Sequence, residues 1–119
     1  MPIKKVDLYA ILDIETTGGK MGEEAITEIA IYRFDGGEVT DRFISLINPE
    51  RKIDDFVVRL TGISNKMVRQ APKFYEVAKR IVEITEGCIL VAHNAAFDYR
   101  ILCLEFRRLG FDYQRSTIC

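Results

Sequence analysis

The chain has 119 residues, 48% of them hydrophobic and 29% charged, and a formal net charge of −1 at pH 7. A chain of this length buries roughly two thirds of its unfolded surface, so we expect one domain with a single core over residues 1–119. No apolar run approaches the ~20 residues of a membrane span, and residues 1–7 do not begin a secretory signal. The sequence therefore predicts a cytoplasmic protein without a membrane partner.

Three cysteines, odd in number and far apart, argue against a disulfide framework and a structural zinc site. The charge is unevenly distributed: residues 1–50 carry five Lys or Arg against ten Asp or Glu, and residues 51–119 carry twelve against eight. Such halves can flank an anionic ligand, although ordinary solvated faces explain the pattern more simply.

The first half of the chain predicts an antiparallel meander of three strands. Residues 8–12 are apolar and predict a buried strand, residues 26–34 a second strand and residues 39–47 a third. Asp35-Gly36-Gly37 is typical of a hairpin turn between the last two.

The second half alternates between helix and strand. Ser64 is expected to cap a short helical segment, and apolar spacing over residues 74–84 predicts a helix that Gly87 ends. The wholly apolar residues 88–92 predict a central strand buried on both faces. A second helix is expected from Asn94 to Gly110, and residues 115–119 resemble the entry to another strand. The predicted order is βββ-α-β-α, an α/β fold.

Two carboxylates one residue apart follow the first strand, at Asp13 and Glu15, with Thr16, Thr17 and Gly18 after them. Residues two apart in a strand face the same side, so these carboxylates are expected to point together away from the core. Such a pair suits a divalent cation with a preference for oxygen ligands, Mg²⁺ or Mn²⁺. Entry into a solvated turn is an equally good explanation of these six residues alone.

A third carboxylate, Asp98, is expected in the first turn of the second helix, directly after the central strand. Because ligands of open α/β sheets collect at the carboxyl ends of strands, Asp98 is expected to approach Asp13 and Glu15. A carboxylate that merely complements the helix dipole is the simpler explanation for Asp98 alone.

Three segments in this order resemble the DnaQ-like proofreading exonucleases of the DEDD family: D-I-E-T-T-G from Asp13, L-T-G-I from Leu60, and H-N-A-A-F-D from His93. The resemblance covers essentially the whole chain. It implies a ribonuclease-H-like fold, a mixed sheet with a three-stranded antiparallel meander and parallel strands, flanked by helices. Glu28 is also similar to a family position near the site.

The resemblance further implies a two-metal 3′-5′ exonuclease that releases 5′-monophosphate nucleotides. Two Mg²⁺ or Mn²⁺ ions would be held by Asp13, Glu15 and Asp98. The implied substrate is a single-stranded or frayed 3′ end of DNA, with RNA as an alternative, and a DNA polymerase subunit is an implied partner. The implied substrate-binding residues are Thr16, Thr17, Gly18, Leu60, Thr61, His93, Asn94 and Phe97; core packing is an equally good explanation for Phe97.

The family's third motif, which supplies a general base and a fourth carboxylate, has no counterpart here. His93 stands five residues before Asp98, but Asn94 and Phe97 assign this segment to the second motif. We therefore interpret the chain as a C-terminally truncated piece of a longer exonuclease, with impaired turnover. The alternative is a non-catalytic, nucleic-acid-binding or polymerase-associated module of the same fold.

Overall fold

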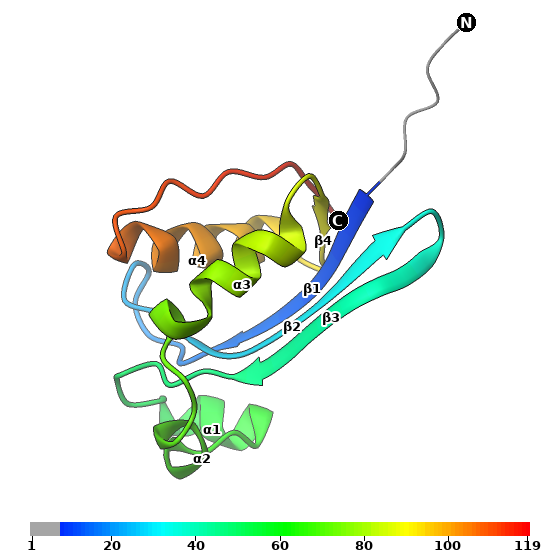
Figure 1. The fold of residues 1–119 in the computed structure, drawn as a ribbon. Helices are drawn as coiled ribbons and strands as arrows, with labels where there is room; N and C mark the ends of the chain where they lie inside the picture. The colour runs from blue at the N-terminus through cyan, green and yellow to red at the C-terminus, as the bar shows by residue number, and fades with distance from the viewer. Residues whose placement is uncertain (1–7) are drawn as a thin grey trace, which may run out of the picture.

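A mixed five-stranded sheet forms the body of the computed structural model, which describes residues 8–119 (Figure 1). The first seven residues of the expected domain lie outside the described part. The strand order is β3-β2-β1-β4-β5. The strands are β1 (Leu8–Thr16), β2 (Ile26–Asp35), β3 (Glu38–Leu46), β4 (Ile89–Val91) and β5 (Thr117–Ile118). The expected meander of β1, β2 and β3 is present, and β4 and β5 run parallel to β1.

Two long helices, α3 (Phe74–Thr85) and α4 (Ala95–Arg108), lie over one face of this sheet (Figure 1). α3 contacts β1, β2 and β3, whereas α4 contacts β1, β4 and β5. Both helices follow the apolar spacing predicted for them. Within residues 8–119, no helix combines the length and the apolar character needed to cross a membrane.

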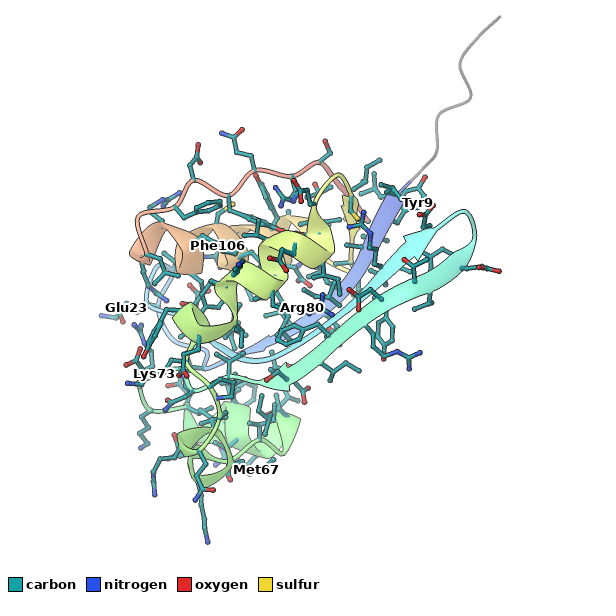
Figure 2. All side chains as sticks on the ribbon, viewed as in Figure 1. Tyr9, Glu23, Met67, Lys73, Arg80 and Phe106 are labelled. Atoms are coloured by element: carbon teal, nitrogen blue, oxygen red, sulfur yellow. The ribbon has the colours of Figure 1, made fainter. Side chains whose placement is uncertain are left out.

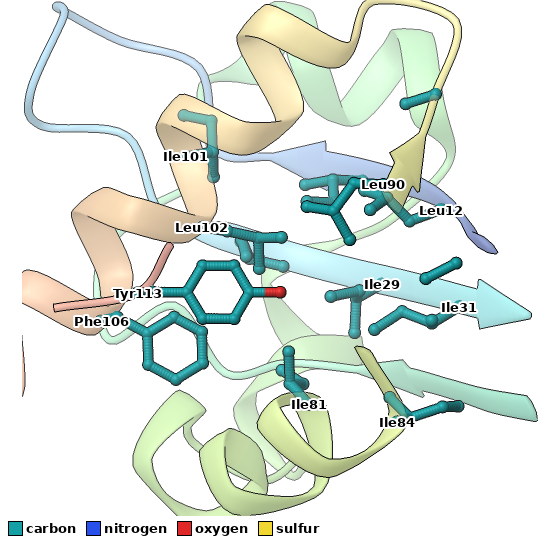
Figure 3. Packing of buried hydrophobic residues seen from close by; sticks show 14 of the residues in the cluster. Leu12, Ile29, Ile31, Ile81, Ile84, Leu90, Ile101, Leu102, Phe106 and Tyr113 are labelled. Carbon is teal, nitrogen blue, oxygen red and sulfur yellow. The ribbon is translucent and has the colours of Figure 1, made fainter. Parts of the chain in front are cut away.

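The core lies between these helices and the sheet, and it includes Phe106 of α4 (Figure 3). The ring of Phe106 stacks on that of Tyr113 with centroids 4.5 Å apart and meets the edge of Phe74 at 5.0 Å. Tyr113 keeps its hydroxyl paired inside the core, because that oxygen lies 2.8 Å from Oγ1 of Thr85. Aromatic pairs of this geometry add to the stabilisation from burial alone.

Two short helices, α1 (Asp55–Thr61) and α2 (Asn65–Arg69), form a separate small cluster beyond the end of β3 (Figure 1). Their core consists of Ile53, Ile63 and Val68, with Leu46 of β3 packed against it. Met67 lies on the outer side of α2 (Figure 2). Helix α1 contains no buried residue. The short helical segment expected after Ser64 is α2, with Ser64 as its N-cap. No helix was predicted over α1, because it lacks the apolar stripe that marks a core-facing helix.

Two strands are less buried than predicted. In β1 the buried residues alternate with exposed ones, and Ile11 is 43% exposed rather than buried. In β4, Ile89 and Val91 are only partly buried, so the expected burial on both faces is wrong. The cause is shared, because α3 and α4 cover only the face that carries Ala10 and Leu90.

We expect Phe106→Ala to destabilise the fold by about 3–5 kcal/mol, because it removes a ring that is 1% exposed and leaves a cavity. Chemical denaturation of the purified chain measures the loss. Phe56→Ala is the matched control, since the Phe56 ring in α1 is 65% exposed and its removal costs little. A similar loss of stability in the two variants would contradict the burial of Phe106 in the core.

Candidate active site

Strand β1 presents Asp13 and Glu15 on the face of the sheet opposite to α3 and α4. Leu12 and Ile14, between and beside them, are 4% and 6% exposed and belong to the core. Asp13 is exposed and Glu15 is half-buried, as the alternation of a strand requires. Across the ladder Glu15 pairs with Glu28 of β2, so a further carboxylate lies directly opposite.

Asp98 reaches the same region from α4. Strand β4 runs parallel to β1, with Val91 opposite Ile11, and three residues separate the end of β4 from the start of α4. The Asp98 side chain lies in the first turn of α4 and is 7% exposed. Like charges at this junction are costly, because a buried carboxylate loses hydration and is repelled by its neighbours.

The carboxylates influence one another electrostatically. Burial, followed by the charges of Asp13 and Glu15, raises the pKa of Asp98 to about 6. Burial and the charges of Asp13 and Glu28 also raise the pKa of Glu15. In the described part of the chain, none of the ion pairs involves Asp13, Glu15 or Asp98. The site is therefore an uncompensated concentration of negative charge.

The donor set fits a hard divalent cation, although it does not form a closed cage. Among residues 8–119 no three His, Cys, Asp or Glu side chains stand close enough to enclose a metal ion on their own. Mg²⁺ is usually held by one or two carboxylates together with water and substrate phosphates, which suits carboxylates arranged loosely on two elements. The mutual repulsion of Asp13, Glu15 and Asp98 is what a bound cation would relieve.

The loop that follows β1 is stabilised by hydrogen bonds from its own threonine side chains. Oγ1 of Thr16 accepts a hydrogen bond from the Gly18 N–H at 3.2 Å. Thr17 is only 1% exposed, and its hydroxyl donates to the Gly18 carbonyl at 2.9 Å and accepts from the Ala25 N–H at 3.3 Å. The Thr17 hydroxyl therefore points into the loop. A contact between this hydroxyl and a ligand would require it to point outward.

Gly18 is the point at which this loop packs closely against the start of α1. Its φ of +73° lies in the left-handed region, and a Cβ at this position would stand 2.7 Å from Cγ2 of Val57 and 3.2 Å from Oδ2 of Asp54. Only glycine meets both conditions without strain. This close approach sets α1, and with it Leu60 and Thr61, beside the end of β1.

Leu60 and Thr61 lie in the last turn of α1 rather than in a loop. Leu60 is 72% exposed, which is unusual for so large an apolar side chain. The Thr61 hydroxyl donates to the Val57 carbonyl at 3.0 Å and accepts from the Ile63 N–H at 3.1 Å. Gly62, with φ of +77°, ends the helix in the left-handed conformation. Of the two side chains, Leu60 is the one available to an external ligand.

The segment before and within the first turn of α4 holds the remaining predicted residues. His93 and Asn94 are exposed, and Asn94 occupies the N-cap position without a capping side-chain hydrogen bond. Phe97 is partly buried and packs against the core, while the Arg100 guanidinium lies 5.4 Å from its ring centroid. The Phe97 side chain is therefore partly packed against the core and partly exposed.

No sequence pattern indicated the contacts that attach the loop between β1 and β2 to α4. Glu24 and Glu105 are each 7% exposed; Glu24 binds Arg100 of α4, and Glu105 pairs with Arg108 of the same helix and accepts from the Ile26 N–H. The partners of Glu24 lie 76 and 84 residues away, so only the fold brings them together.

Residues 10–119 match the profile of the exonuclease family. The chain belongs to this family. Because the match includes all three segments that carry Asp13, Leu60 and Asp98, the exonuclease resemblance seen in the sequence is confirmed.

Relatives of this exonuclease domain are much longer proteins. DNA polymerase III PolC-type from Caldanaerobacter subterraneus is 34% identical over 110 residues, which cover 92% of this chain and 8% of the polymerase. The 3′-5′ exonuclease DinG from Bacillus subtilis is 38% identical over 105 residues, covering 87% of this chain and 11% of DinG. The chain thus spans about a tenth of the curated relatives that it matches.

Solved exonuclease structures share the fold. E. coli exonuclease I in complex with a dT13 oligonucleotide matches with a TM-score of 0.81 at 20% identity, over 93% of this chain and 27% of that one. The nuclease domain of 3′hExo, a DEDDh family member bound to rAMP, matches with a TM-score of 0.73 at 22% identity, over 92% of this chain and 62% of that one. The predicted ribonuclease-H-like fold is confirmed.

We expect Asp98→Asn to stabilise the metal-free chain near pH 8 by about 1–3 kcal/mol, because the raised pKa of Asp98 marks a charge that the folded state tolerates poorly. The folded-state value of about 6 exceeds the ordinary 3.8. The cost of ionisation is consequently absent below pH ~4, grows as the pH rises, and is complete above pH ~6. Thermal unfolding in EDTA at pH 8 and pH 4 measures it.

The control is Asp35→Asn, which neutralises an exposed carboxylate at the end of β2. It is expected to leave stability nearly unchanged at both pH values. An Asp98→Asn gain of equal size at pH 4 and pH 8 would show that the gain does not arise from the charge of Asp98.

Proposed function

We propose that the chain acts as a divalent-metal-dependent 3′-5′ exonuclease that removes 5′-monophosphate nucleotides from nucleic-acid 3′ ends. The observation that carries the proposal is the uncompensated group of Asp13, Glu15 and Asp98 on adjacent ends of β1 and α4. Without a cation or a catalytic task, such a group only destabilises the fold, and strained or repelling groups concentrate at functional sites. These carboxylates, all retained, also favour an enzyme over a non-catalytic module.

Asp13 and Glu15, with Asp98 opposite them, would hold two Mg²⁺ or Mn²⁺ ions. Bound there, the ions would supply Lewis-acid stabilisation of charge on the scissile phosphate and lower the pKa of water. Asp98 is kept close to the β1 pair by the packing of α4, so its carboxylate is charged and available once a cation offsets the repulsion. Glu28 would reinforce the negative potential from β2.

The terminal nucleotide would be bound between the β1 loop and α1. Thr16 and the backbone of Gly18 would line one side, and the exposed Leu60 would pack against the terminal base from α1. Thr17 and Thr61 would act by shaping these two segments, because their hydroxyls already have partners inside the protein. His93, Asn94 and the exposed edge of Phe97 would contact the preceding nucleotide.

The substrate would be a single-stranded or frayed 3′ end of DNA, with proofreading or repair as the cellular role in the cytoplasm. A PolC-type DNA polymerase among the relatives supports a polymerase partner, and DinG is itself named a 3′-5′ exonuclease. RNA is the second substrate to test, since 3′hExo was solved with rAMP and exonuclease I with a DNA oligonucleotide.

We expect the wild-type chain to bind Mn²⁺ saturably in a calorimetric titration and to shorten a 5′-labelled single-stranded oligonucleotide from its 3′ end only slowly, because no counterpart of the third motif supplies a general base. Asp13→Ala should abolish both properties, because it removes the exposed carboxylate of the β1 pair. Asp35→Ala, an exposed carboxylate at the far end of β2, should change neither. Mn²⁺ binding that is unchanged in Asp13→Ala would refute the site.

A further inference from the structure

The loop between β1 and β2, residues 17–25, is attached to α4 by the Glu24–Arg100 ion pair and by hydrogen bonds from Arg108 to two loop carbonyls. Arg100 of α4 donates from both terminal nitrogens to the Glu24 carboxylate, at 3.2 and 2.6 Å. Arg108, two turns further along α4, donates to Glu105 at 3.1 Å and to the carbonyl oxygens of Gly22 and Glu24 at 3.1 and 2.8 Å. We call this set of contacts the loop clamp.

Both glutamates of the loop clamp also accept hydrogen bonds from backbone N–H groups. The second oxygen of Glu105 accepts from the Ile26 N–H at 3.0 Å, and Glu24 also accepts from the Gly22 N–H at 2.9 Å. Hydrogen bonds from Arg100 lower the pKa of Glu24, so this carboxylate is charged at neutral pH. Buried charges are tolerated only with such partners, which makes the relation between the loop and α4 specific in geometry.

The loop clamp joins the two elements that flank the carboxylates. The loop continues directly from Thr16 and Gly18 at the end of β1, while α4 carries Phe97 and Asp98 in its first turn. Asp98 and the β1 carboxylates repel each other, which favours separation of α4 from β1. Attachment of the loop to α4 resists that separation.

Arg100 has a second contact within the loop clamp. Its guanidinium lies 5.4 Å from the centroid of the Phe97 ring, one turn earlier on α4. Cation–π contacts at this distance are attractive, and a guanidinium with two fixed hydrogen bonds has little freedom to move. Glu24 therefore fixes Arg100, and Arg100 restricts the Phe97 ring.

We propose that Glu24 is a positioning residue that acts through Arg100 to hold Phe97 where it contacts the nucleotide preceding the 3′ terminus. This inference rests on the proposed exonuclease function. It predicts that loss of the Glu24 charge weakens binding of a strand while leaving binding of a single terminal nucleotide and of metal unchanged, because those contacts belong to β1 and its loop.

The chain contains a matched control for this arrangement. Arg80 of α3 donates to both oxygens of Asp41 in β3 at 2.7 Å, and its guanidinium lies 5.9 Å from the Phe43 ring. The chemistry is the same: a carboxylate, an arginine bound through two nitrogens, and a phenylalanine under the guanidinium. β3 is separated from β1 by β2, so this group is remote from the carboxylates.

The experiment compares wild type, Glu24→Gln and Asp41→Asn, each saturated with Mn²⁺. Fluorescence anisotropy measures affinity for a labelled dT oligonucleotide, and calorimetry measures affinity for thymidine 5′-monophosphate and for Mn²⁺ alone. We expect Glu24→Gln to weaken oligonucleotide binding about tenfold and the other two affinities less than twofold. Asp41→Asn should leave all three affinities within twofold of wild type.

Two further measurements test the positioning role of Glu24. Proton NMR shifts of the Phe97 ring should move in Glu24→Gln and not in Asp41→Asn, and this holds without any substrate. Arg100→Lys, which keeps the charge but not the planar two-nitrogen contact, should reproduce the selective loss if Glu24→Gln fails to fold.

Equal oligonucleotide affinity and an unchanged Phe97 spectrum in Glu24→Gln would overturn the positioning role and leave the exonuclease proposal intact. Equal loss for the oligonucleotide, the mononucleotide and Mn²⁺ would also overturn it, because this would indicate general damage. A wild-type chain that binds none of the three ligands would refute the exonuclease proposal and the positioning role together.

Discussion

The burial of alternate residues of β1 under α3 and α4 is the constraint on which the rest of the structure depends. Ala10, Leu12 and Ile14 enter the core, and the period of a strand then forces Asp13 and Glu15 onto the opposite face. A shift of one residue in register would bury both carboxylates and expose three core residues, at a cost far above the stability of a small domain. The position of the carboxylate pair is thus determined by apolar packing.

Placement of β1 beside β4 brings the third carboxylate to the pair. The short β4 leads directly into α4, and the apolar side of that helix, including Ile101 and Phe106, holds its first turn against the sheet. Asp98 is consequently 7% exposed although its charge is unpaired. The unfavourable burial of the Asp98 charge is offset by the packing of α4 against the core and by the loop clamp. Such a balance between stability and a functional site is common in enzymes.

Sequence patterns predicted the meander, α3, α4 and the shared face of Asp13 and Glu15, because each depends on a local period in the chain. Helix α1 was missed because none of its residues is buried. The inward rotation of Thr17 and the pairing of Glu24 with Arg100 were also missed. Both depend on contacts made across the fold, with Ala25 and with α4, which no local pattern encodes.

Exposure of the sheet was the other property that local patterns misjudged. Residues 8–12 predicted a buried strand and residues 88–92 a strand buried on both faces, whereas Ile11 is 43% exposed and Ile89 and Val91 are only partly buried. An apolar run indicates only that its residues are compatible with burial. Which face of the sheet is buried depends on where the helices pack. Asp13 and Glu15 lie on this open face, accessible to a cation and a strand, whereas Asp98 is 7% exposed in the first turn of α4.

The most direct test of the carboxylate site is anomalous X-ray scattering from crystals of the wild-type chain grown with Mn²⁺ and a nucleoside 5′-monophosphate. The site described above predicts manganese peaks within coordination distance of the Asp13, Glu15 and Asp98 carboxylates, with the phosphate of the nucleotide bound to the same ions. Ordered manganese and nucleotide found only elsewhere on the molecule, with these three carboxylates free of metal, would contradict it.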